Sequence, residues 1–425
     1  MSVSYKRENI CEGAGYTEII DKRFKTNYIY IHLLEPMDRK NASANAVIPE
    51  LLHDSNEKYP TITALCRKLS SLYHAGISSG ASKLGDYQVM TLKSSSIADK
   101  YTIDGENISG EVVDILLDCL TQPHLENGIF PENEFRLKKQ ELLDDIDAEI
   151  NDKRKFAVGK ARETIYKDEP AGIPVEGYRE DAEKLTSADV YKRYTELLKN
   201  ARIEVVFSGC GIGEADKQKI FDRIRGLDRN APSGYKTMPS AKKSDMVYVT
   251  DRMDVNQSKM VIAYKTDCDS KQTMKMLSFV FGGTPFSMLF ENVREKLSLC
   301  YYCPSGYNEK KQVLMIDCGI EHRNINPARE EIFRQLELLK NGGFSEELLA
   351  NSKLLAKSSL KAVYDSPSSV ANRFFSQCMD DKIVTPEEEA RLIDAVTKED
   401  IVAAANTLVP DTVYVLTGKE DPENE

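Results

Sequence analysis

Apolar positions in this chain alternate between strand-like and helix-like patterns along its whole length. In the first half, residues 27–34 predict a strand buried on both faces, because nearly every position is apolar or aromatic. Residues 112–120 carry apolar side chains at helical spacing, and a longer helix is predicted to begin at Pro131. The apolar face predicted for that longer helix consists of Phe135, Leu142, Ile146 and Ile150.

The second half shows the same alternation. Residues 258–265 and 312–318 predict strands, and residues 273–281 predict a helix between them. Thr385 and Glu388 form a capping-box pattern with proline at the first helical position. Runs of strands and runs of helices predict an α+β fold of two tandem related αβ repeats. Each repeat is expected to be a mostly antiparallel sheet with helices packed on one face.

An internal repeat supports this division. Thr186 and Thr397 each stand in an N-cap position, each followed three residues later by an aspartate and then by apolar residues at helical spacing. Each predicted helix leads into a strand that ends at glycine, residues 202–209 and 411–418. The two copies lie about half a chain length apart, which indicates duplication of one αβ unit.

A second pair of similar segments, residues 67–73 and 294–301, closes a helix before a strand in each half. Turn-forming residues cluster at 229–236, where no apolar period is visible. We therefore expect one domain over residues 1–228 and another over residues 229–425.

Composition narrows the class of protein. The 425 residues are 41% hydrophobic and 29% charged, with no apolar run of the roughly 20 residues that span a bilayer. The net charge of −11 argues against a general nucleic-acid or anionic-membrane surface. The N-terminus has no signal-peptide pattern, and nine scattered cysteines fit a reducing compartment, so a cytoplasmic location is expected.

Several segments together resemble the insulinase/pitrilysin superfamily of inverted zinc peptidases, and in particular its bacterial branch similar to the mitochondrial processing peptidases. The segments are Lys58-Tyr59-Pro60, residues 281–283, residues 290–296, Leu299, Tyr301 and the closing residues 396–400. The resemblance covers nearly the whole chain. It implies that this chain is one half of a clam-shell that closes around an extended peptide, with a second copy or a related chain as the other half.

The metal motif of that family is degenerate here. Where the family has His-x-x-Glu-His, this chain has Ala46, Pro49 and Glu50, so only one position offers a ligand atom. The third ligand position of the family falls at about Asp144 or Asp145, whose side chains are shorter than glutamate. No two histidines stand four residues apart anywhere in the sequence. The sequence therefore predicts no catalytic residue and no metal site in this chain.

The resemblance further implies that Arg294 and Tyr301 bind substrate backbone across the cavity. A guanidinium and a phenol hydroxyl suit carbonyl and oxyanion partners. The alternative is that Arg294 pairs with Glu291 or Glu295 on a solvated helix face while Tyr301 fills a core.

Gly282 and Gly283 are candidates for a flexible loop near the peptide entrance, or for the C-cap of the preceding helix. Cys300 and Cys303 form a C-x-x-C pattern, which without a second pair is a weak indication of redox or metal chemistry.

Three hypotheses follow. The first is a non-catalytic subunit that forms a peptide-binding chamber with a zinc-bearing homologue, so that zinc is expected only in the partner chain. The second is a stand-alone peptide-binding or scaffold protein, a homodimer without a hydrolytic role. The third is an enzyme that uses Cys300 and Cys303.

Overall fold

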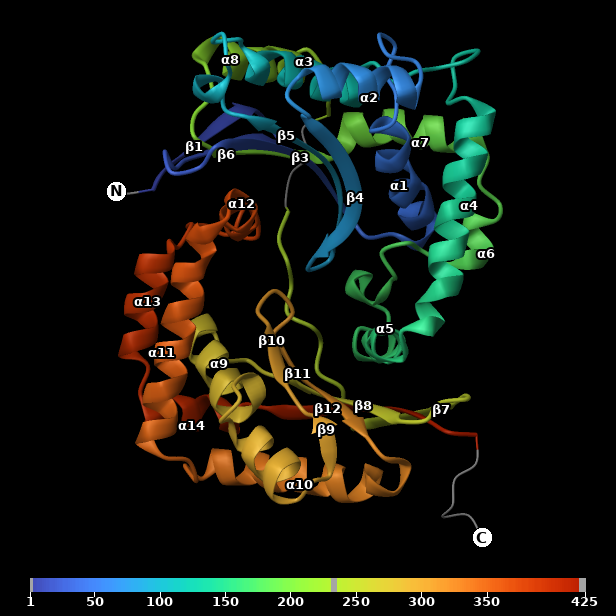
Figure 1. Cartoon of the computed structure of the whole chain (residues 1–425). Coiled ribbons are helices and arrows are strands. Elements are labelled where there is room, and N and C mark those ends of the chain that lie inside the picture. The colour runs from blue at the N-terminus through green and yellow to red at the C-terminus, as the bar shows by residue number, and fades with distance from the viewer. Residues whose placement is uncertain (1–2, 231–234, 420–425) are drawn as a thin grey trace. The chain divides into compact units, whose positions relative to one another are not determined.

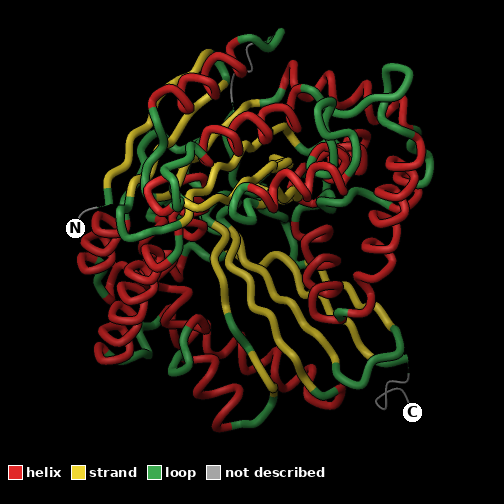
Figure 2. Tube along the Cα trace, turned by 45° about the horizontal axis from the view of Figure 1, so that its top comes forward, coloured by secondary structure: helices red, strands yellow, loops and turns green. Residues whose placement is uncertain are grey.

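The computed structural model describes residues 3–230 and 235–419, which divide into two compact units (Figures 1 and 2). The first unit consists of Met1–Asp147, Ile173–Lys236 and Val363–Ile383. The second consists of Ala148–Gly172, Thr237–Ala362 and Val384–Glu425. The turn-rich stretch predicted at 229–236 includes residues 231–234, which lie outside the described residues.

The first unit is built on a six-stranded sheet in the order β1-β2-β6-β3-β5-β4. Strands β2 and β6 are parallel, and the other neighbours are antiparallel, so the sheet is mixed. Its strands are β1 (Ser4–Cys11), β2 (Ala14–Ile20), β3 (Thr26–Pro36), β4 (Gly76–Leu84), β5 (Tyr87–Ile97) and β6 (Arg202–Gly209). Strand β3 is buried over nearly its whole length, which confirms the prediction for residues 27–34.

Helices cover the two faces of this sheet unequally. Apolar side chains of β3 and β6 pack against α1, α3, α7 and α8 on one face. On the other face, Val370 and Phe374 of α12 pack against Tyr30 and Val206. The helices of this unit are α1 (Arg39–Leu52), α2 (Ile62–Ser71), α3 (Ile108–Thr121), α4 (Glu132–Ala148), α6 (Arg179–Ala182), α7 (Ser187–Asn200), α8 (Glu214–Arg225) and α12 (Pro367–Phe375), with the short η1 (Asp99–Tyr101) and η7 (Val363–Asp365).

The second unit has a six-stranded sheet in which β10-β11-β8-β12-β7 are consecutive neighbours and β9 also pairs with β11. Strands β12 and β7 are parallel and the remaining pairs are antiparallel, a second mixed sheet. Figure 2 shows its strands running side by side. They are β7 (Val247–Arg252), β8 (Ser258–Lys265), β9 (Cys300–Tyr302), β10 (Ser305–Asn308), β11 (Val313–Ile320) and β12 (Val409–Thr417).

The main helical layer of the second unit packs on one face of this sheet, where Ile262 and Ile316 meet α9, α10 and α14. The opposite face packs against α5 through Ala157, Ala161 and Ile165. The helices of this unit are α5 (Lys153–Ile165), α9 (Lys271–Ser278), α10 (Ile325–Lys340), α11 (Glu346–Ala362), α13 (Pro386–Ala395) and α14 (Lys398–Asn406). Shorter turns are η2 (Glu149–Asn151), η3 (Pro170–Gly172), η4 (Phe279–Gly283), η5 (Phe290–Lys296) and η6 (His322–Asn324), of which η4 and η5 are π-helical.

Five neighbouring strands have the same order in both sheets, β2-β6-β3-β5-β4 and β7-β12-β8-β11-β10, as expected for the predicted repeat. Strand β6 lies between β2 and β3, and β12 lies in the same way between β7 and β8. Both preceding helices begin with a complete capping box, at Thr186 and at Thr397. The main layer of helices occupies one face of each sheet, as expected, but α12 and α5 add a helix to the other face.

One detail of the long helix differs from the sequence prediction. Helix α4 begins at Glu132, directly after Pro131, but ends at Ala148. Ile150 therefore lies beyond the helix and is 42% exposed, so its assignment to the buried face was wrong. Across residues 3–230 and 235–419 no helix combines the length and the apolar character needed to cross a bilayer.

Candidate functional site

Helix α1 carries the three positions that correspond to the zinc motif. Its N-cap, Asp38, accepts a hydrogen bond from the backbone N–H of Lys40 at 3.1 Å. Ala46 is 7% exposed and belongs to the hydrophobic core of the first unit. Pro49 is buried inside the helix, where it lacks the N–H of an ordinary helical residue. Only Glu50 presents a polar side chain, 38% exposed.

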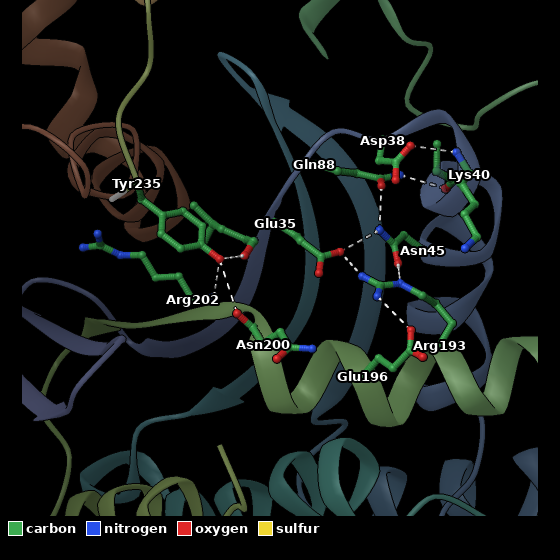
Figure 3. A network of polar contacts seen from close by, with 12 residues as sticks. Glu35, Asp38, Lys40, Asn45, Gln88, Arg193, Glu196, Asn200, Arg202 and Tyr235 are labelled. Carbon is green, nitrogen blue, oxygen red and sulfur yellow. Dashed lines mark hydrogen bonds and ion pairs between the residues drawn. The ribbon is translucent and has the colours of Figure 1, made fainter. Parts of the chain in front are cut away.

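Buried hydrogen bonds fix this helix to its neighbours through the residue before Ala46 (Figure 3). Asn45 donates to Gln88 Oε1 on β5 at 3.0 Å and accepts from Arg193 Nε on α7 at 2.9 Å. Arg193 also pairs with Glu35 on β3. Gln88 in turn donates to the backbone carbonyl of Ala42 at 2.9 Å. This buried polar network ties α1 to β3, β5 and α7.

A second polar cluster surrounds Glu50 at the C-terminal end of α1. Ser79 on β4 donates to Glu50 Oε1 at 2.7 Å and lies 2.9 Å from Nδ1 of His53. The other ring nitrogen of His53 lies 3.0 Å from Asp54 Oδ1. Asp54 Oδ2 also pairs with the ammonium group of Lys138 on α4 at 2.8 Å. The imidazole, the hydroxyl and both carboxylates are therefore engaged with one another.

Helix α4 contributes a cation, the ammonium group of Lys138, to this cluster. Lys138 is 12% exposed and pairs with Glu141 at 3.1 Å as well as with Asp54. Asp145 lies on the same face of α4 as Lys138, because residues 138, 141 and 145 follow helical spacing. Asp144 lies on another face, where it accepts a hydrogen bond from Gln140. Both aspartates are exposed. Within the described part of the chain, no three His, Cys, Asp or Glu side chains are grouped to hold a metal ion.

These residues do not fit a catalytic zinc ion. Such a site needs three protein ligands and a carboxylate free to activate water. Here one motif position is an alanine in the core, a second is proline, and the third is a glutamate bonded to Ser79. The ammonium group of Lys138, which pairs with Asp54 in the cluster around Glu50, would also repel a divalent cation.

Arg294 and Tyr301 lie on two consecutive elements of the second unit, η5 and β9, which pack against each other. The Arg294 side chain is 42% exposed, lies over the ring of Phe290 at 4.7 Å, and has Glu295 Oε1 at 3.7 Å. Its weak pairing with Glu295 is one of the two arrangements expected for a solvated helix face. Tyr301 is 57% exposed and donates to Glu321 at 3.3 Å, so the alternative in which it fills a core was wrong.

The glycine pair closes the π-helical turn η4. Gly282 is buried, and a Cβ added to it would lie 2.7 Å from the backbone nitrogen of Ser305. A Cβ on Gly283 would lie 3.1 Å from the carbonyl oxygen of Ser278. Close approach of the backbone therefore explains the need for glycine at 282. The proposed mobility of this pair stays a prediction.

The C-x-x-C pattern lies in the core of the second unit. Cys303 and a third cysteine on β11, Cys318, have their sulfur atoms 2.9 Å apart, and both side chains are buried. Burial raises the pKa of both thiols. The hydrogen bond with Cys303, followed by burial, raises the pKa of Cys300. Thiols with raised pKa are poor nucleophiles, so this geometry does not favour cysteine catalysis.

Comparison with known proteins agrees with this picture. A family model described as the peptidase M16 inactive domain matches residues 184–355. A Bacillus subtilis protein described as "Probable inactive metalloprotease YmfF" is 26% identical, with 98% of this chain and 99% of that protein covered. An "Uncharacterized zinc protease" of Rickettsia felis is 22% identical over 70% of this chain and 73% of its own length.

Solved structures share the fold over the full length. A conserved protein from Enterococcus faecalis V583 superposes with a TM-score of 0.90 at 23% identity, covering 99% of this chain and 100% of that one. The peptidase M16 inactive domain from Pseudomonas fluorescens gives a TM-score of 0.78 at 16% identity, with 99% of each chain covered. These structures show the shared fold, and the family match over residues 184–355 together with the full-length likeness to the Bacillus subtilis protein identifies the chain as an inactive-domain protein of the M16 (insulinase) peptidase family.

Proposed function

We propose that this chain is a cytoplasmic, non-catalytic M16-family subunit that helps to form a peptide-binding chamber with a zinc-bearing homologue. In this proposal the partner supplies zinc and the water-activating glutamate, and performs hydrolysis of the peptide bond. This chain supplies part of the chamber wall and binds the peptide backbone.

The observation that carries the proposal is the contrast between its two candidate segments. Of the three motif positions on α1, only Glu50 offers oxygen atoms that could bind a metal ion. Its carboxylate already accepts a hydrogen bond from Ser79. Arg294 and Tyr301, in contrast, are 42% and 57% exposed, and their polar contacts to Glu295 and Glu321 are long, at 3.7 Å and 3.3 Å. Exposed donors of this kind remain available to a ligand, whereas the metal chemistry has no residues to perform it.

The descriptions of the relatives are compatible with the kind of partner that we propose. One is described as a probable inactive metalloprotease, and two Rickettsia proteins are described as uncharacterized zinc proteases. This chain is thus similar both to a protein described as inactive and to proteins described as zinc proteases. A pairing of one chain of each kind is the arrangement that we propose.

The test mixes this purified chain with a zinc-bearing homologue from the same organism that carries an intact His-x-x-Glu-His motif. Peptide hydrolysis is followed with a library of quenched fluorescent peptides. We expect hydrolysis by the mixture to exceed hydrolysis by the homologue alone by at least about tenfold, because substrate positioning supplies several kcal/mol of transition-state stabilisation. No gain on mixing contradicts the proposal.

Variants of this chain assign the effect to named residues. Arg294→Gln and Tyr301→Phe are each expected to lower kcat/KM of the mixture about tenfold, since each removes one charged or phenolic donor. Arg391→Gln is the matched control, because Arg391 is exposed on α13, away from η5 and β9 in the sequence. Peptide binding by this chain alone as a homodimer, with no gain from the homologue, favours the stand-alone scaffold instead.

A further inference from the structure

Three cysteine side chains meet in the core of the second unit. Cys300 begins β9, Cys303 lies in the two-residue link between β9 and β10, and Cys318 lies in β11. A hydrogen bond joins the thiols of Cys300 and Cys303, and the sulfur atoms of Cys303 and Cys318 are 2.9 Å apart. All three are free thiols in this structure. Cys303 therefore contacts both of the other cysteines.

The residues on either side of Cys303 fix its register against β11. Tyr302 pairs with Gly319 in an antiparallel ladder. The carbonyl of Pro304 accepts a hydrogen bond from the backbone N–H of Asp317 at 3.0 Å. The cysteine between Tyr302 and Pro304 therefore faces the cysteine between Asp317 and Gly319. Residues that face each other in antiparallel strands have Cα atoms about 4.5–5.5 Å apart, which lies within the roughly 4.4–6.8 Å that a disulfide bond spans.

Exposure indicates which sulfur atom an oxidant reaches first. Cys300 and Cys303 are 8% and 6% exposed, whereas Cys318 is fully buried. The link that holds Cys303 lies at the edge of the sheet, because β9 and β10 both pair with β11 as their neighbour. Local opening of a two-residue link at a sheet edge costs less than unfolding of the whole unit. Cys303 thus combines access for a small oxidant with direct contact to the buried thiol behind it.

We propose that Cys303 is a site of oxidation by hydrogen peroxide, and that the product is a disulfide bond between Cys303 and Cys318. In the first step the Cys303 sulfur attacks the peroxide, the O–O bond breaks, and a sulfenic acid and one water molecule form. In the second step the Cys318 sulfur attacks the sulfenic sulfur, and the hydroxyl group leaves as a second water molecule. The two thiols lose two electrons and two protons, and the peroxide is reduced to water.

The disulfide bond would change the stability of the second unit. Cys303 and Cys318 lie 15 residues apart, so the bond closes a loop that contains β10 and the start of β11. A cross-link across a loop of this length stabilises a protein mainly by restricting its unfolded chain. We expect the midpoint of thermal unfolding to rise by about 5–10 °C on oxidation and to return to its former value on reduction. This inference does not depend on the proposed peptide-processing role.

Peptide mapping by mass spectrometry on the full native chain tests the assignment. The chain is treated with excess hydrogen peroxide, because burial slows thiol oxidation. It is then alkylated without reduction and digested with trypsin. Cleavage after Lys310 places Cys300 and Cys303 in one peptide and Cys318 in another. We expect these two peptides to be joined through Cys303 and to separate after treatment with dithiothreitol. No cross-link, a cross-link only in urea, or a bond between Cys300 and Cys303 overturns the proposal.

Substitutions assign the bond to its two sulfur atoms. Alanine is used because a buried serine hydroxyl lacks an assured partner. Cys303→Ala and Cys318→Ala should each abolish the cross-link and the rise in unfolding temperature, and Cys300→Ala should retain both. Cys119→Ala is the matched control, since Cys119 is equally buried but lies in the first unit, where Asn56 donates to its sulfur at 3.5 Å. Circular dichroism establishes that each variant is folded. Loss of the cross-link in Cys300→Ala, or its survival in Cys318→Ala, contradicts the proposal.

Discussion

Replacement of one buried histidine should change how the stability of the chain depends on pH. His32 lies in the middle of β3 and is 4% exposed. Its Nδ1 lies 2.8 Å from Thr91 Oγ1 on β5, and its ring stacks on Phe375 of α12 with centroids 3.7 Å apart. Burial lowers the pKa of His32 to about 3, because the charged imidazolium loses its hydration inside the first unit.

The sign and size of the effect follow from that shift. The pKa of a histidine in an unfolded chain is about 6.5, so between about pH 6.5 and pH 3 the unfolded chain binds a proton that the folded chain does not. The contribution of His32 to stability is therefore complete above about pH 6.5 and decreases as the pH falls. One pKa unit corresponds to about 1.4 kcal/mol, so the free energy of unfolding should fall by about 2 kcal/mol at pH 5 from this group.

The measurement is urea denaturation followed by far-ultraviolet circular dichroism at about pH 5 and about pH 7.5. His32→Gln keeps a hydrogen-bonding side chain but cannot titrate, so it should lose about 2 kcal/mol less than the parent between these two values. His74→Asn is the control, since His74 is exposed and its backbone φ of 56° suits asparagine. An identical pH dependence in the parent chain and in His32→Gln would refute this reasoning.

Three further substitutions test the packing that supports the candidate site. Asp411→Asn should destabilise the second unit by about 3–5 kcal/mol in urea denaturation, because it removes the charge partner of the buried Lys265. The Lys265 ammonium is 2% exposed and lies 2.9 Å from the Asp411 carboxylate. An effect below about 1 kcal/mol refutes this prediction. Gly282→Ala should cost about 1–3 kcal/mol through the clash with Ser305, and unchanged thermal stability contradicts the close packing. Thr397→Ala should cost about 1 kcal/mol from the lost capping box, measured in the same assay.

The sequence predicted those parts of the fold that depend on neighbouring residues. Strand β3 and the capping boxes at Thr186 and Thr397 are local patterns, and the structure reproduces them. Helices α5 and α12 were not placed, because periodicity identifies a buried face without identifying the sheet that covers it. The apolar stripe of α5, formed by Ala157, Ala161 and Ile165, is also a weak signal of a buried helix face in the sequence, since two of its three members are alanines.

The candidate site was predicted only in part for the same reason. The loss of motif residues at Ala46 and Pro49 is visible in one short segment. The cluster around Glu50 is not, because Ser79 and Lys138 come from β4 and α4 and meet α1 only in the folded unit. A histidine and an aspartate directly after the motif helix were the only local signal of that cluster.

The central claim is that the motif helix of this chain cannot hold and use a catalytic zinc ion. The most direct test measures metal content and peptide hydrolysis of the isolated, partner-free chain after incubation with zinc and dialysis. We predict no stoichiometric zinc and no hydrolysis, with or without a chelator. Peptide hydrolysis by the isolated chain that is abolished by a chelator and restored by zinc would contradict the account.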